Sequence, residues 1–120
     1  MKLNFDPAKP IYAQIVDGFR LDICSGALKP GSRVVPVREL ALGLGVNPNT
    51  LQRALMELER EGLLYTERTA GRFVCADEAL IARTRDDLIK NMVGDFLKNA
   101  AKLGCSKEEL ISLMNGEMEQ

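Results

Sequence analysis

Residues 37–58 read VRELALGLGVNPNTLQRALMEL and contain two short helical patterns on either side of a tight turn. Gly45 supplies a left-handed turn, Asn47 is a favourable N-cap, and Pro48 suits the first position of a helix. The apolar residues of both patterns recur at helical spacing and can share one core: Val37, Leu40, Ala41, Leu44, Val46, Leu51, Ala54, Leu55 and Leu58. The sequence therefore predicts two helices that cross closely at Ala41.

The second of these helices begins with a group of polar side chains on its outer side, namely Asn47, Asn49, Thr50, Gln52 and Arg53. This arrangement is typical of a helix-turn-helix, whose second helix places its N-terminal end in the major groove of DNA. Amides and hydroxyls bind base edges or phosphates, and an arginine binds phosphate or guanine. A purely structural helical hairpin is the alternative, and the clustering of polar residues where DNA would lie favours the DNA-binding interpretation.

The segments on both sides extend this unit. After Pro10, apolar residues recur every four positions from Ile11 to Ile23, which predicts a helix, and residues 25–35 are expected to form a connector. After Gly62 the sequence LLYTE, the turn RTAG and the sequence RFVC predict a β-hairpin. The order of elements predicts a mainly α fold with one small hairpin.

A helical tail follows the hairpin, because no proline interrupts residues 77–103 and Ser106–Glu109 form a capping box before a last short helix. An apolar stripe runs along the long helix: Ile81, Leu88, Met92, Phe96 and Leu103. The short last helix offers too little surface to cover this stripe, so we expect a second copy of the chain to cover it. Folding of the tail onto its own N-terminal domain is the alternative, and the acidic polar face disfavours a membrane-surface helix.

The composition of the chain excludes several classes of function. The chain has 120 residues and a net charge of −1, with 10 Lys+Arg against 8 Asp+Glu in residues 1–76 and 6 against 9 in residues 77–120. It has no histidine, which excludes histidine-dependent nucleophiles, general bases and zinc sites, so neither an enzyme nor a cofactor is expected. The three cysteines suggest small buried residues. No apolar run reaches the ~18 residues of a membrane span, so we expect a cytoplasmic protein with no membrane partner.

Residues 10–75 closely resemble the winged helix-turn-helix domain of the GntR family of bacterial transcription regulators. The linked segments PIYAQI, GALKPG, VRELA, GVNPNT, ELEREGLL and RFV carry this resemblance. The tail is similar to that of the YtrA-like subfamily, which implies dimerisation through residues 77–120. Two departures stand out: Val34-Val35-Pro36 replaces the usual Leu-Pro-Ser, and Thr69-Ala70-Gly71-Arg72 replaces a Gly-x-Gly wing.

The resemblance implies a DNA-binding domain over residues 1–76, with contacts from the second and third helices and from the tip of the hairpin. These residues are Arg38, Asn47, Asn49, Thr50, Gln52, Arg53, Thr69, Gly71 and Arg72. For Arg53 a phosphate contact and a pair with Glu57 remain equal alternatives. Arg33 and Arg68 are weaker candidates for a DNA contact, and a solvated surface position is favoured for each.

The implied function is that of a sequence-specific transcription regulator that binds an inverted-repeat operator in double-stranded DNA as a homodimer and represses transcription. A winged-helix protein-interaction module without DNA is the alternative, and the sequence identifies no effector.

Overall fold

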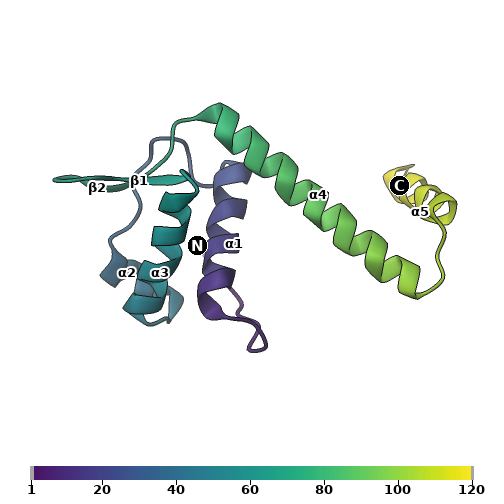
Figure 1. Ribbon diagram of the computed structural model, residues 1–120, viewed down its shortest axis with the longest axis horizontal. Coiled ribbons are helices and arrows are strands. Elements are labelled where there is room, and N and C mark those ends of the chain that lie inside the picture. Colours follow the sequence, from purple (N-terminus) through teal and green to yellow (C-terminus); the bar gives the residue numbers. More distant parts are fainter. Residues whose placement is uncertain (1, 120) are drawn as a thin grey trace. The chain divides into compact units, whose positions relative to one another are not determined.

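The computed structural model describes residues 2–119 and confirms a mainly helical chain with one β-hairpin (Figure 1). Its elements are α1 (Ile11–Ser25), α2 (Val37–Leu44), α3 (Pro48–Arg60), β1 (Leu64–Glu67), β2 (Gly71–Val74), α4 (Glu78–Lys102) and α5 (Lys107–Glu119). The chain forms two compact units, which divide between Arg85 and Asp86.

The turn between α2 and α3 has the chemistry that the sequence predicts. Gly45 ends α2 with φ 69°, a left-handed conformation that costs glycine little. Asn47 then caps α3, because its side-chain oxygen accepts a hydrogen bond of 2.7 Å from the backbone N–H of Asn49. Pro48 occupies the first helical position, so the start of α3 is fixed by three consecutive local preferences.

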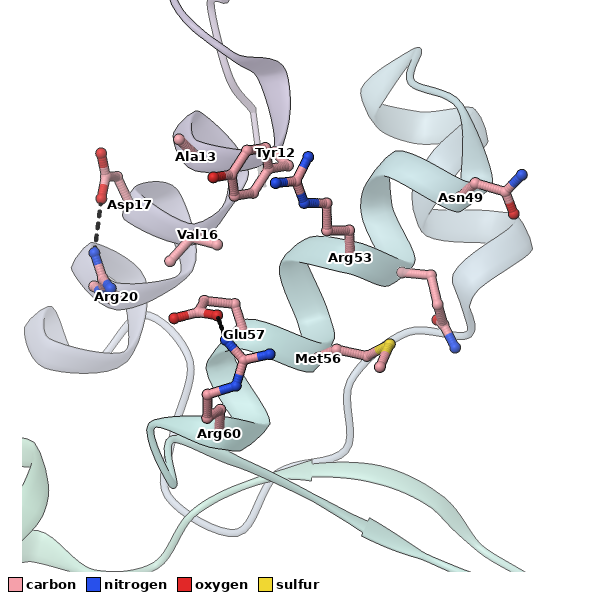
Figure 2. A pocket seen from close by; sticks show the side chains of 11 residues that line it. Tyr12, Ala13, Val16, Asp17, Arg20, Asn49, Arg53, Met56, Glu57 and Arg60 are labelled. Carbon is pink, nitrogen blue, oxygen red and sulfur yellow. Dashed lines mark hydrogen bonds and ion pairs between the residues drawn. The ribbon is translucent and has the colours of Figure 1, made fainter.

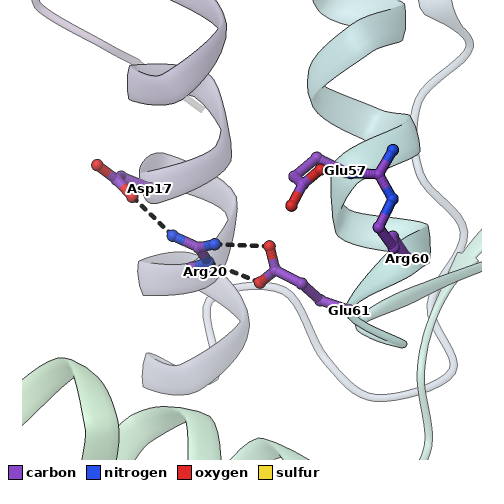
Figure 3. A network of polar contacts seen from close by, with 5 residues as sticks. All are labelled: Asp17, Arg20, Glu57, Arg60 and Glu61. Carbon is purple, nitrogen blue, oxygen red and sulfur yellow. Dashed lines mark hydrogen bonds and ion pairs between the residues drawn. The ribbon is translucent and has the colours of Figure 1, made fainter.

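One apolar core holds the first unit together, with both α1 and α2 packed against α3. Its largest fully buried side chains are Phe19, Ile15, Ile23, Leu51, Leu55, Leu58, Leu63, Leu64 and Val74. A polar contact closes the edge of this core, where the Arg20 guanidinium of α1 donates two hydrogen bonds of 2.8 and 2.6 Å to the Glu61 carboxylate (Figure 3). The core thus orients α3 relative to the rest of the unit.

The hairpin β1–β2, which we call the wing, pairs Tyr65 with Phe73 and Thr66 with Arg72. Residues 31–34 add a third segment along β2, although the sequence predicted only a connector there. The N–H of Val34 donates to the carbonyl of Arg72 at 2.8 Å, and the N–H of Val74 donates to that of Ser32 at 2.9 Å. This pairing satisfies backbone groups on the otherwise open edge of β2.

The first unit extends further along the chain than residue 76, the boundary that the sequence predicted. Leu80 and Ile81 at the start of α4 pack against its core. The predicted assignment of Ile81 to the dimerisation stripe therefore needs correction, since its contacts lie within its own unit. The cysteine prediction is confirmed only for Cys75, because Cys24 and Cys105 are half-buried.

The second unit consists of α4 from Asp86 onward and α5. Ser106 caps α5, since its Oγ accepts a hydrogen bond of 3.1 Å from the N–H of Glu109, and Leu110 is buried. No residue of α4 is buried in the described chain. The exposed apolar residues on one side of α4, which we call the tail stripe, are Ile89, Met92, Val93, Phe96 and Leu97. Of the other residues predicted for this stripe, Leu88 is half-buried, and Leu103, just after α4, is exposed.

Candidate nucleic-acid interface

The start of α3 presents the polar side chains that the sequence placed there. Asn49, Gln52 and Arg53 are exposed, and Thr50 is half-buried. Asn47 is exposed as well, but its oxygen is already engaged by the helix cap, so its amide nitrogen is the group left to donate to an outside acceptor. The structure brings the predicted α3 residues together at the end of the helix that a major groove would receive.

Arg38 lies in the first turn of α2 and is exposed. It borders a shallow hollow whose other lining residues come from α2, the turn and the start of α3: Ala41, Leu42, Gly45, Val46 and Pro48. The residue before α2 is Pro36, which offers no side-chain acceptor to the first N–H groups of the helix. These N–H groups remain available to an anion, as is common where helices meet phosphate.

Arg53 does not pair with Glu57, which was the alternative to a phosphate contact that the sequence left open. Its guanidinium lies over the ring of Tyr12 at 3.6 Å from the ring centroid, while Glu57 forms an ion pair with Arg60 (Figure 2). Both Tyr12 and Arg53 line a groove of about 630 Å³ between α1 and α3. The stacking on Tyr12 holds the Arg53 cation next to Asn49 and Gln52 without neutralising it.

The tip of the wing contains Thr69, which is exposed, and Gly71, which has φ 107°. Arg72 differs from the expectation of a cation presented at this tip. Its Nε donates to the Glu59 carboxylate on α3, and only 16% of its side chain is exposed. Alternation along β2 explains this direction, since residue 72 lies on the same face as the buried Val74.

Two residues near the interface were not among the predicted DNA contacts, namely Arg33, for which a solvated surface position was favoured, and Tyr12. Arg33 lies against Gly71, so close that a Cβ at position 71 would be 3.1 Å from its Nε. Its position depends on the pairing of residues 31–34 with β2, for which the sequence contains no alternation of apolar and polar residues. Tyr12 belongs to the PIYAQI segment, and the sequence assigned it only to the apolar face of α1. In the structure its ring is half-buried.

Other kinds of site find no support in the part of the chain that the structure describes. Residues 2–119 contain no group of histidine, cysteine or acidic side chains that could hold a metal ion. No helix within the same range has the length and apolar character needed to cross a membrane.

Comparison of this chain with known sequences shows the family to which it belongs. Residues 11–74 match the family described as bacterial regulatory proteins, gntR family. The chain is 36% identical to the uncharacterized HTH-type transcriptional regulator YhcF of Bacillus subtilis (strain 168) over 92% of both chains. It is 32% identical to the HTH-type transcriptional repressor YtrA of the same organism, over 90% of this chain and 85% of that protein.

Comparison with solved structures agrees. A GntR family transcriptional regulator from Listeria monocytogenes is 38% identical, with a TM-score of 0.87 over 93% of this chain and 98% of that one. AraR(DBD) in complex with operator ORX1 is 29% identical, with a TM-score of 0.56 over 62% of this chain and 95% of that one. The chain is therefore a member of the GntR family, a DNA-binding helix-turn-helix transcription regulator of the winged type.

Proposed function

We propose that the chain acts as a homodimer that binds an inverted-repeat operator and represses transcription from it. The tail stripe carries this proposal, because an exposed apolar row along a 25-residue helix without a buried residue needs a cover. A second copy supplies an identical stripe, and a two-fold pair of tails buries both. A two-fold protein requires a two-fold operator, so each half-site is read by one α3.

Within each half-site, we assign base reading to the exposed residues of α2 and α3. Arg38, Asn49 and Gln52 have side chains that suit base edges, and Thr50 and Asn47 add shorter donors or acceptors. The Tyr12–Arg53 stack favours a backbone contact for Arg53, since its guanidinium is held in place but stays charged. The wing tip, with Thr69 and Gly71, would enter the neighbouring minor groove.

Repression is supported by the relative YtrA of Bacillus subtilis, whose name describes it as a transcriptional repressor and which aligns with 90% of this chain. A dimer bound across a promoter blocks access of RNA polymerase without any further domain. Activation would need a contact with the polymerase, and the described residues give no specific argument for one.

Selection of bound sequences from random duplex DNA tests the operator. We expect an enriched site with a dyad, and enrichment of a single unrepeated site would contradict binding as a two-fold dimer. A reporter gene with the selected operator placed over its promoter then tests repression. We expect lower expression when the protein is present, and increased expression would overturn the assignment as a repressor.

A further inference from the structure

We propose that Arg33, rather than Arg72, is the arginine with which the wing binds the DNA backbone, and that Arg72 positions the wing on α3. This inference rests on the proposed operator contact of the wing and assigns two residues within it.

Successive residues of a strand point to opposite faces of a sheet. In β2 the buried Val74 marks the face toward the core, and Arg72 lies on this same face, opposite Thr66 of β1. Gly71 and Phe73 lie on the other face. Arg33 pairs with Phe73 and therefore shares the outer face of the wing.

The inner face is already occupied by a polar contact. Glu59 of α3 accepts from the Arg72 Nε and, through the same oxygen Oε1, from the Thr66 hydroxyl at 2.9 Å. A single carboxylate thus links both strands of the wing to the helix that reads DNA. A guanidinium held in this way contributes to the position of the wing, and its charge is balanced within the chain.

The outer face carries an arginine without such a partner. Arg33 is exposed, and no ion pair of it is found among the described residues. Its guanidinium lies next to Gly71 at the wing tip, where an added Cβ would be 3.1 Å from the Arg33 Nε and would require a small shift of this side chain. Arg33 also lines the hollow of about 240 Å³ between the segment before α2 and β2, with Pro36, Val37 and Gly71.

These observations give the two arginines different roles. Phosphate is bound by cations whose charge is free to replace condensed counterions. Arg33 meets this requirement at the wing, whereas the ion pair between Arg72 and Glu59 would have to break before Arg72 could bind phosphate. Arg33 therefore supplies the phosphate contact, and Arg72 keeps the wing at a fixed distance from the start of α3.

The test compares variants of the full chain on its selected operator across a salt series. Arg33→Ala should weaken binding to operator and scrambled duplex by the same factor and lower the slope of log K against log salt by about one per subunit. Arg33→Lys should keep the slope. Arg83→Ala removes the same charge from α4, outside the wing, and should leave the slope unchanged.

Arg72→Ala should leave the salt slope unchanged and reduce the protection of the β2 amides against hydrogen exchange. Glu59→Gln should also reduce this protection, and the double variant should lose no more protection than Glu59→Gln alone, because Arg72 acts on the wing through Glu59. A slope that falls for Arg72→Ala and not for Arg33→Ala would overturn the inference. Absence of salt-dependent duplex binding by the unmodified protein would instead overturn the proposed function.

Discussion

Arg38 is the exposed cation of α2 and our main candidate for reading a base. Arg38→Ala should cost about 1–3 kcal/mol of binding free energy on the operator and flatten the preference at one base pair of each half-site. Arg38→Lys is the matched variant, since it keeps the charge and loses the planar fork that suits guanine. Binding isotherms of both variants on single-base operator changes give the measurement.

The comparison with scrambled duplex decides between reading and clamping. If Arg38→Ala weakens operator and scrambled DNA by the same factor, Arg38 is a phosphate contact. Base reading would then belong to Asn49, Thr50 and Gln52 of α3.

At the level of single residues, the sequence predicted the group of polar side chains at the start of α3 but not where the arginines around it point. Asn47 was predictable as a cap because helix starts depend on neighbouring residues. The direction of Arg72 depends on the register between β1 and β2, and that of Arg53 depends on the packing of α1 on α3. The hairpin register is local, but the face of the hairpin that meets Glu59 of α3 and the face of α3 that meets α1 are set by packing between separate elements, which local patterns do not reveal.

Among the elements, α1 and α3 are joined at one edge by the Arg20–Glu61 pair, whose side chains are 29% and 25% exposed. The Glu61 hydrogen bond raises the pKa of Arg20 above its ordinary value. Glu61→Gln should lower the free energy of unfolding by about 1–2 kcal/mol, because it weakens a two-point, charge-assisted contact. Urea unfolding at a fixed protein concentration measures this.

Arg60→Ala is the matched control on the same helix, since its pair with Glu57 is far more open, with 74% of the Arg60 side chain exposed. The unfolding free energy should change by less than about 0.5 kcal/mol. Equal losses for Glu61→Gln and Arg60→Ala would show that the Arg20 pair contributes no more than a surface ion pair.

The helices and the hairpin were predictable because residues near their ends favour a turn or a cap, such as Gly45 between α2 and α3. The third wing segment was not, since residues 31–34 lack the alternation of a strand and pair only through the edge that β2 offers. The boundary of the first unit lies at Arg85 and not at the predicted residue 76 for a related reason. Leu80 and Ile81 look like the rest of the tail in sequence, and only the folded core shows which side they join.

For the whole molecule, dimerisation depends on the tail stripe. Phe96 belongs to this stripe and is 52% exposed. Phe96→Asp would place a charge in the proposed interface at a cost of several kcal/mol. We expect light scattering to give the monomer mass for this variant at concentrations where the unmodified protein is a dimer. Operator binding should weaken in parallel, because two linked half-site contacts become independent.

Asn91→Asp is the matched control, since Asn91 is exposed on the side of α4 opposite the stripe at about 100° per residue. The same added charge should leave the dimer mass unchanged there. A dimer that persists in Phe96→Asp would move the interface away from the tail stripe, and a monomer in both variants would point to a general effect of charge on α4.

Because the cations of the candidate interface are arginines, we expect operator binding to be independent of pH. The chain has no histidine, guanidinium groups stay charged at every physiological pH, and the amide and hydroxyl groups at the start of α3 do not ionise. Cys24 and Cys105 favour the neutral thiol, because burial raises the pKa of Cys24 and a hydrogen bond with Glu109 raises the pKa of Cys105. At constant salt, operator isotherms at about pH 6 and about pH 8 should therefore coincide, whereas a histidine-bearing interface would bind more tightly in acid. This regulator would hold its promoter with the same strength as the cell acidifies.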